Sequence, residues 1–444
     1  MPSFAVYLRD TMPQQAAPFR AASGEADLNL SIERIEVLLL IAAVVSMLAR
    51  RLRLPYTVGL VLAGVVVAWT RLPLDVTLTK SLIFTAFLPP LIFEAAFLMP
   101  WNGLRKDLPV TLTLATLGVL LSVGVVTAGI FYILHWPWQA ALLLGVLISA
   151  TDPVSVIATF KAARVHGRLG LLVEAESLFN DGTAAVLFGV AVAAVTSGAA
   201  LGAGNIALSF LVTVLGGVAC GAVVGGGALF LAGRTDDHLV EITFTTVAAY
   251  GSFLIAEHFH FSGVLATLTA GILLGNVGPL GAITDKGRES VTAFWEYIGF
   301  VVNSLIFLLI GMPLARQNFA GLWGSLAVVL VLVLAGRAVD VYGCAALFAG
   351  NSSLRVSFAH QHILFWGGLR GALSLALALS LPASVPLRNE ITVISFGVVA
   401  FSIIVQGLTM KPLLHKLGEI PPPGDGQTAA LRSNPEVSAQ VSSA

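Results

Sequence analysis

Charged residues are scarce in this sequence. Of its 444 residues only 11% are Asp, Glu, Lys or Arg, whereas a soluble domain averages about 25%. The 24 basic and 24 acidic residues cancel, and no basic patch indicates a nucleic-acid partner. Hydrophobic residues make up 57% of the chain. These proportions exclude a soluble enzyme or a nucleic-acid-binding module, and a protein of the lipid bilayer is expected.

Cysteine is almost absent as well. Cys220 and Cys344 each lie within an apolar run, so we expect small core residues rather than a disulfide or a metal site. We also expect no signal peptide, because residues 1–30 are polar and have no basic start, apolar middle or small-residue cleavage site. We expect no cofactor.

Long apolar runs are what the sequence does contain. A helix needs about 20 apolar residues to cross a bilayer, and continuous runs favour helices over a barrel. The runs predict about thirteen helices, at 31–49, 55–70, 79–98, 110–134, 139–160, 168–197, 205–232, 239–258, 262–278, 290–314, 320–349, 357–382 and 390–417. We therefore expect an all-α polytopic membrane protein, with a polar segment at 1–30, a membrane domain at 31–418 and a short disordered tail at 419–444.

Lysine and arginine are distributed unevenly between alternate loops. One set of loops carries Arg50, Arg51, Arg53, Arg105, Lys106, Lys161, Arg164, Arg168, Arg234, Lys286, Arg288, Arg355, Lys411 and Lys416. The other set holds only Arg71, Lys80, Arg316 and Arg388. Because basic loops stay in the cytoplasm, we expect a cytoplasmic C-terminus, an outer N-terminus and a location in the plasma (cell inner) membrane.

Two aspartates lie deep inside neighbouring apolar runs. Asp152 precedes Pro153 in the fifth predicted helix, and Asp181 lies in the sixth. A charged carboxylate in hydrocarbon costs at least about 2.5–3.5 kcal/mol, so such residues are usually functional. Proline removes a backbone donor and disfavours helix at the residue before it. Many transporters build an ion site near the midplane from a broken helix, and these aspartates are candidates for one.

The fifth and twelfth predicted helices share an interruption. If the seventh helix is a linker, six helices precede it and six follow, and an odd linker inverts the second half. The Asp152-Pro153 break then corresponds to the glycine-rich stretch at 367–371. We therefore expect two inverted six-helix repeats, with crossed, unwound helices and a binding site between them.

Further polar residues share the helix of Asp181. Ser177 lies four residues before it on the same helix face, so a hydroxyl and a carboxylate, both hard oxygen ligands, are available to a small cation. Glu176 and Asn180, which are also four residues apart, offer a carboxylate and an amide on a face rotated by about 100°. Glu176 could belong to the site or neutralise an arginine.

Two arginines lie within apolar runs and need partners. For Arg337 the candidates are Asp340, three residues on, and Glu176 from another helix. Structural pairing is the favoured role of Arg337. Arg370 lies at the glycine-rich break, where its charge could offset either the site carboxylates or the helix ends.

Glu94 is a third acid in an apolar run. It follows Pro89 and Pro90, which free backbone carbonyls one turn upstream. The predicted direction of its helix places Glu94 toward the cytoplasmic end, where it could be a peripheral ligand, a gate or a structural residue.

Four motifs resemble a known family. They are ATDPVSVIATFK, ESLFNDGTAAVLF, FVVNSLIFLLIG and GGLRGALSLALALSLP. Together they resemble the monovalent cation/proton antiporter superfamily, and within it the electroneutral sodium/proton branch of NhaP-like and NHE-like proteins. The resemblance covers about residues 31–418. It implies an NhaA-like antiporter fold, a homodimer, and a core bundle that moves against a dimer bundle, with the core including the helices near 79–98, 139–197, 290–314 and 357–382.

The resemblance also implies residue roles. Asp181 matches the essential cation- and proton-binding aspartate, and Asn180 matches the asparagine before it in the electroneutral branch. Glu176 and Arg337 match a structural ion pair between helices. Arg370 matches the arginine of the twelfth-helix crossover.

The remaining matches concern the cation itself. Thr151 and Asp152 match residues of the unwound fifth helix, Ser177 matches the site hydroxyl, and Glu94 matches a third-helix acid that helps to hold the ion in some members. The resemblance therefore implies a sodium site formed by Asp181, Asp152, Ser177, Thr151 and Glu94.

The predicted function is exchange of sodium, and of lithium, for protons. A proton and a cation competing for Asp181 would couple the two fluxes, and Asn180 in place of a second acid implies electroneutral exchange. A potassium/proton antiporter of the same fold is the open alternative. More distant ones are a channel, for which a charged ring at a pore mouth is lacking, and an intramembrane aspartyl protease, for which a Gly-x-Gly-Asp motif is lacking.

Overall fold

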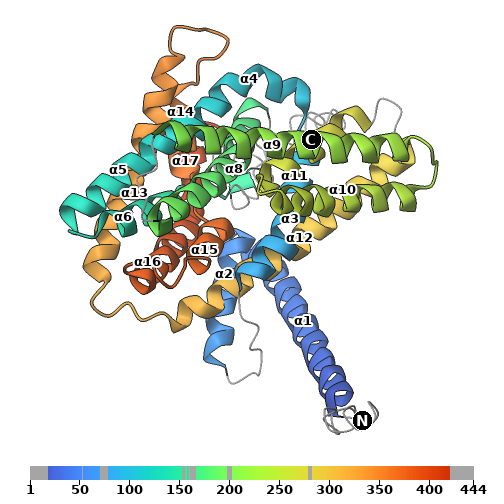
Figure 1. The fold of residues 1–444 in the computed structure, drawn as a ribbon, viewed down its shortest axis with the longest axis horizontal. Helices are drawn as coiled ribbons and strands as arrows, with labels where there is room; N and C mark the ends of the chain where they lie inside the picture. The colour runs from blue at the N-terminus through green and yellow to red at the C-terminus, as the bar shows by residue number, and fades with distance from the viewer. Residues whose placement is uncertain are drawn as a thin grey trace, which may run out of the picture.

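The computed structural model describes residues 19–52, 54–70, 79–152, 156–157, 160, 167–197, 203–278 and 283–420. Within these ranges the chain is helical and has no strand (Figure 1). The helices are α1 (Phe19–Leu52), α2 (Tyr56–Trp69), η1 (Leu82–Phe87), α3 (Leu88–Leu98), α4 (Trp101–Thr113), η2 (Leu114–Gly118), α5 (Val119–Ile133), α6 (Trp138–Leu147), α8 (Arg168–Ser197), α9 (Ala203–Ala232), α10 (His238–His258), α11 (Gly263–Val277), α12 (Asp285–Arg316), α13 (Trp323–Leu347), α14 (Phe358–Gly367), α15 (Ala372–Leu379), α16 (Arg388–Phe401), η4 (Ser402–Gln406) and α17 (Gly407–Lys416).

These helices form thirteen successive segments, which confirms the predicted number. Two of these segments each contain two α-helices joined by a π-helix. In the fourth segment η2 joins α4 to α5, and in the thirteenth η4 joins α16 to α17. In the described part of the chain, eight segments are long and apolar enough to cross a membrane by length and composition alone.

Two helices begin earlier than the apolar runs indicate. The first begins at Phe19, inside the predicted polar segment, and the fourth begins at Trp101 instead of residue 110. In the fourth, Arg105 and Lys106 are exposed, while Asp107 is buried against an arginine. Hydropathy marks the apolar part of a helix, whereas the helical hydrogen bonds continue into polar turns at its end.

Glycines allow several helices to approach closely. At the contact of α2 with α12, a Cβ on Gly64 would overlap the carbonyl of Leu308, and one on Gly311 would overlap the carbonyl of Val61. On α11, a Cβ on Gly275 would overlap the carbonyl of Phe97 in α3. Lipid offers little hydrophobic drive between helices, so close backbone packing of this kind holds such bundles together.

Most contacts between helices fall within two groups, and the groups touch where α8 contacts α3 and α11 and where α12 contacts α15 and α16. One group contains α2, α3, α10, α11 and α12, and the other contains α4, α5, α6, α8 and α13 to α17. The seventh segment, α9, contacts α8 in the second group and α10 and α11 in the first, which fits the predicted linker.

Two segments are interrupted, as the sequence predicts. In the fifth, α6 ends at Leu147 and residues 149–152 leave the helix. In the twelfth, α14 ends at Gly367 and α15 begins at Ala372. A backbone hydrogen bond from Asp152 N to the carbonyl of Leu369, 2.7 Å long, joins the two breaks. The two interruptions therefore face one another.

One ion pair ties together three loops of the predicted cytoplasmic set. Arg168, at the start of α8, contacts the buried Asp107 of α4 at 2.7 Å. The same guanidinium donates to the carbonyls of Leu354 and Arg355, at 3.1 and 2.8 Å, in the connection between α13 and α14. All three loops therefore lie at one end of the bundle.

Some predictions concern residues that lie outside the described ones. These are Pro153 and most of the second half of the fifth helix, the connection at 161–166, the first 18 residues, and the tail at 421–444.

Candidate ion-binding site

Where the two interrupted segments cross, Arg370 lies at the C-terminal end of α6 and Asp152 lies at the N-terminal end of α15. Arg370 Nη1 donates to the carbonyl of Ser149, and also to that of Ala150 at 3.3 Å. These carbonyls follow the C-terminus of α6, where the helix dipole is negative. Arg370 therefore lies at a helix end, and its charge also acts on the carboxylate of Asp181, so both roles left open for it have support.

Asp152 occupies the complementary position. Gly371 is the N-cap of α15 and has no side-chain cap. A Cβ on Gly371 would overlap the Asp152 carboxylate, so this carboxylate lies against the positive end of α15. Ser374 adds a hydrogen bond from its hydroxyl to the carbonyl of Ala150 at 3.3 Å.

Thr151 gathers polar side chains from α8. The Ser177 hydroxyl donates to the Thr151 carbonyl at 2.7 Å and lies 2.9 Å from Thr151 Oγ1. Asn180 Nδ2 donates to the same Oγ1 at 3.1 Å. Thr151, Ser177 and Asn180 are each at most 2% exposed. The sequence-predicted residues of α8 therefore meet the unwound stretch at Thr151.

Asp181 lies beside this group and keeps one oxygen available. Its Oδ1 is buried and has no hydrogen-bond partner among the described residues, and the same holds for Asn180 Oδ1. Asp152, Glu176 and Arg370 are all close enough to act electrostatically on Asp181, which also accepts a hydrogen bond from the Thr151 backbone. Two buried, unpartnered oxygens beside further acids suit a small cation or a proton.

The predicted pair of Glu176 and Arg337 is present, and it includes a third residue. Arg337 holds Glu176 with both of its terminal nitrogens, at 2.8 and 3.0 Å, and Asp340 with one of them, at 2.7 Å. It also donates to the Leu364 carbonyl at 3.0 Å. All three charged residues are 2% exposed. The sequence offered Asp340 and Glu176 as alternative partners, whereas the structure uses both.

Glu94 has a neighbour that the sequence did not indicate. A Cβ on Gly299 of α12 would lie 2.8 Å from Glu94 Oε2, so the carboxylate rests on the backbone of that helix. The described contact thus places Glu94 at the junction of α3 with α12. Its membership of the ion site stays a prediction.

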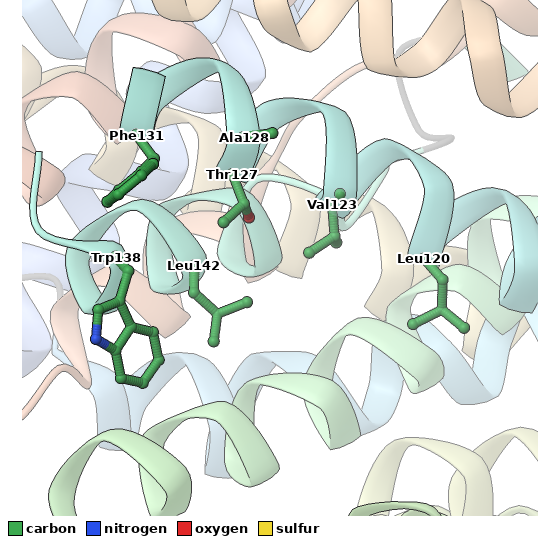
Figure 2. Close-up of a pocket in the computed structure, with 8 residues that line it drawn as sticks. Leu120, Val123, Thr127, Ala128, Phe131, Trp138 and Leu142 are labelled. Carbon is green, nitrogen blue, oxygen red and sulfur yellow. The ribbon is translucent and has the colours of Figure 1, made fainter. Parts of the chain in front are cut away.

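An apolar groove lies elsewhere, on α5 and α6 (Figure 2). Leu120, Val123, Phe131, Trp138 and Leu142 line it together with Gly124, Ala128 and a single polar side chain, Thr127. It offers no acid to a cation, so the charged crossing is the better candidate for an ion site.

Comparison with known proteins identifies the family. The family described as "Sodium/hydrogen exchanger, transmembrane" matches residues 37–416. The chain belongs to the sodium/hydrogen exchanger family. Membership makes it a transporter and excludes the aspartyl protease alternative.

Relatives within the sodium/hydrogen exchanger family are similar over most of their length. The Na(+)/H(+) antiporter ApNhaP of Aphanothece halophytica is 38% identical over 427 residues, covering 95% of this chain and 81% of the relative. The Na(+)/H(+) antiporter NhaH of Halobacillus aidingensis is 36% identical over 400 residues, covering 86% and 98%.

A solved antiporter shares the fold. The sodium proton antiporter MjNhaP1 from Methanocaldococcus jannaschii, determined at pH 8, superposes with a TM-score of 0.71 over 88% of this chain and 99% of its own. The two sequences are 20% identical, so this likeness concerns the fold alone. It confirms the predicted antiporter architecture.

Four features of the site could not be predicted from the sequence. The hydrogen bond between the two breaks and the use of Leu364 are backbone contacts, which carry no residue signature. Ser374 looks like an ordinary serine in an apolar helix. The place of Gly371 could be found only from its contact with Asp152.

Proposed function

We propose that the protein exchanges sodium for protons across a membrane by alternating access at one site centred on Asp181. Membership of the sodium/hydrogen exchanger family and the names of its relatives support sodium and protons as the transported ions. The observation that carries the choice of site is the buried, unpartnered Oδ1 of Asp181 beside the two facing breaks.

Competition for one carboxylate couples the two fluxes. Asp181 holds either a proton or a cation, and a carrier that changes its access only when loaded exchanges one for the other. The neighbouring residue is Asn180, which is neutral, so one positive charge is exchanged for one and transport is electroneutral. Lithium, the smaller alkali cation, is transported as well.

The supporting residues have separate roles in this proposal. Thr151, Ser177 and Asn180 form the wall of the site, and Glu94 is a peripheral acid on the path. Asp152 offers its carboxylate to both α15 and the cation. Glu176 and Arg337 hold α8 to α13, and Arg370 stabilises the end of α6.

Movement of the core bundle, which includes the helices near 79–98, 139–197, 290–314 and 357–382, against the dimer bundle gives alternating access. Two copies of the chain form a homodimer through the dimer bundle. The protein lies in the plasma membrane with its C-terminus in the cytoplasm. The meeting of Asp107, Arg168 and Arg355 at one end supports this orientation, because all three belong to loops of the basic set.

Proton movement in liposomes tests the proposed exchange. Purified protein would be reconstituted with an imposed pH gradient, and lumenal pH would be followed after addition of sodium, lithium or potassium. We expect proton movement with sodium and lithium, and no effect of clamping the membrane voltage. Movement with potassium would establish the alternative cation, and a rate that follows the voltage would contradict electroneutral exchange.

A further inference from the structure

Four acids and two buried arginines surround the crossing. The acids are Asp152, Glu176, Asp181 and Asp340, and the arginines are Arg337 and Arg370. Asp181 is within electrostatic reach of Asp152, Glu176 and Arg370, and Asp340 is within reach of Glu176 and both arginines. If every acid were ionised, the set would carry two excess negative charges. One transported ion at Asp181 balances only one of them, and an unbalanced charge in the membrane interior is costly.

The excess is located in the group around Arg337. Its single guanidinium faces two carboxyl groups, those of Glu176 and Asp340, and each of the three residues is 2% exposed. A buried ion pair is tolerated when its charges balance and its hydrogen bonds are complete. Here the charges do not balance unless one of the two acids carries a proton.

The hydrogen bonds distinguish the two acids. Glu176 accepts from Arg337 on both oxygens, and Asn180 Nδ2 donates to its Oε1 at 3.2 Å. Three donors on one carboxylate favour its ionised form. Asp340 accepts from Arg337 on Oδ2, whereas its Oδ1 is buried and has no partner among the described residues. The proton therefore has a place on Asp340 and none on Glu176.

Other helices leave this oxygen without a counter-charge. Asp340 Oδ1 lies against Gly118 of the π-helix η2, where a Cβ would overlap it. The charged or titratable groups that face Asp340 are Arg337 and Cys344 on its own helix, Glu176 on α8, and Arg370 at the crossing. No second cation is bonded to it in the described part of the chain, because the hydrogen bonds of Arg370 run to the end of α6.

We propose that Asp340 is a second proton-binding residue, which holds a resident proton on Oδ1 and acts as a pH-sensing positioning residue for Asp181. When this proton passes to water at high pH, Asp340 competes fully with Glu176 for Arg337. The change reaches the site through Asn180, which bonds both Glu176 and Thr151. Asp340 touches no transported ion in this scheme.

The two acids give a matched pair of variants for thermal unfolding in detergent, followed as a function of pH. Asp340→Asn replaces a neutral acid by a neutral amide that the unfolded chain cannot ionise, so at neutral pH it unfolds at the wild-type temperature or above it. Glu176→Gln removes a charge that Arg337 requires, so it loses several degrees. Because the folded wild type would hold a proton that the unfolded chain releases, its stability falls as pH rises. The stability of Asp340→Asn lacks the part of this fall with rising pH that the proton on Asp340 causes. Equal destabilisation of the two variants at neutral pH would overturn the proposal.

Infrared spectroscopy detects the proton directly on the wild-type protein. With saturating sodium, so that Asp181 holds the cation, the spectrum of wild type minus Asp340→Asn shows the carbonyl stretch of a protonated carboxyl group, and this band disappears at high pH. Absence of the band at neutral pH would overturn the proposal.

The sensing role rests on the proposed exchange at Asp181, whereas the protonation is measured without transport. In liposomes Asp340→Asn retains sodium-dependent proton movement, and its pH profile lacks one ionisation step that the wild type shows. An unchanged profile in a variant that lacks the infrared band would leave Asp340 protonated but reject its sensing role. Loss of exchange by wild type itself would concern the proposed function and not the proton on Asp340.

Discussion

A single amide connects the proposed ion site to the buried charge cluster. Asn180 Nδ2 donates to Thr151 Oγ1 at 3.1 Å and to Glu176 Oε1 at 3.2 Å, while its Oδ1 is unpartnered in the described structure. A second aspartate at this position would place another negative charge beside Asp181 and lose both donated bonds. The asparagine therefore serves the geometry of the site as well as its charge.

Removing either member of the Glu176–Arg337 pair should lower stability strongly. A buried pair that loses one partner leaves an uncompensated charge, at a cost of about 3–5 kcal/mol. We expect Glu176→Gln and Arg337→Met to unfold at clearly lower temperature in detergent and to express poorly. Glu289→Gln, at an exposed acid, is the control. Wild-type unfolding temperatures in both single variants would show that the pair does not hold the fold.

Residue chemistry could be predicted from the sequence because charge in an apolar run is costly. That cost singled out Asp152, Asp181, Arg337 and Arg370 before any contact was known. The sharing of Arg337 between two acids could not be predicted, because it depends on how α8 and α13 are rotated against each other.

At the level of helices, the crossing is stabilised by an exchange of charged ends. Arg370, from the break of the twelfth segment, neutralises the end of α6, and Asp152, from the break of the fifth, lies at the start of α15. Each interrupted segment thus supplies the counter-charge for the other. Breaking a helix in the membrane is affordable where the freed backbone groups are compensated in this way.

Gly371 should be essential to this arrangement. In Gly371→Ala the added Cβ would overlap the Asp152 carboxylate, which must then leave the start of α15. We expect a large loss of sodium-dependent proton movement in liposomes. The control is Gly367→Ala, four residues away, where the nearest atom to a Cβ is the flexible Met410 Cε at 3.4 Å. If both variants exchanged at the wild-type rate, the close contact at Gly371 would be unimportant.

The number of helices could be predicted from hydropathy, whereas the positions of the helix ends could not. The apolar runs gave thirteen segments, but the additional turns of α1 and α4 are polar and carry no hydropathy signal. The glycines of the twelfth segment indicated its interruption, because glycine permits the non-helical backbone angles that are found at Gly368 and Gly371.

At the scale of the whole molecule, the loops of the basic set converge. Arg168 joins the loop region of Asp107 to that of Arg355, and His360 contacts Glu419, which follows α17 (3.3 Å). These contacts lie at the end opposite to Arg316 and Arg388 if the chain alternates as its thirteen segments require. The proposed orientation in the membrane rests on this one basic end.

Cysteine labelling tests this orientation. In a background without Cys220 and Cys344, a cysteine would be introduced by Lys416→Cys or by Arg316→Cys. We expect a membrane-impermeant thiol reagent to modify the second variant in intact cells and the first only after permeabilisation. The reverse pattern would invert the assigned topology.

The most direct test of the account is the Asp181→Asn variant in sodium-loaded and pH-jumped liposomes, beside Asp236→Asn at an exposed position. The account predicts no sodium-dependent proton movement in Asp181→Asn, an unfolding temperature near that of the wild type, and no stabilisation by added sodium, since a ligand stabilises only the protein that binds it. Asp236→Asn should match the wild type in all three respects. Exchange by Asp181→Asn at the wild-type rate would contradict the account.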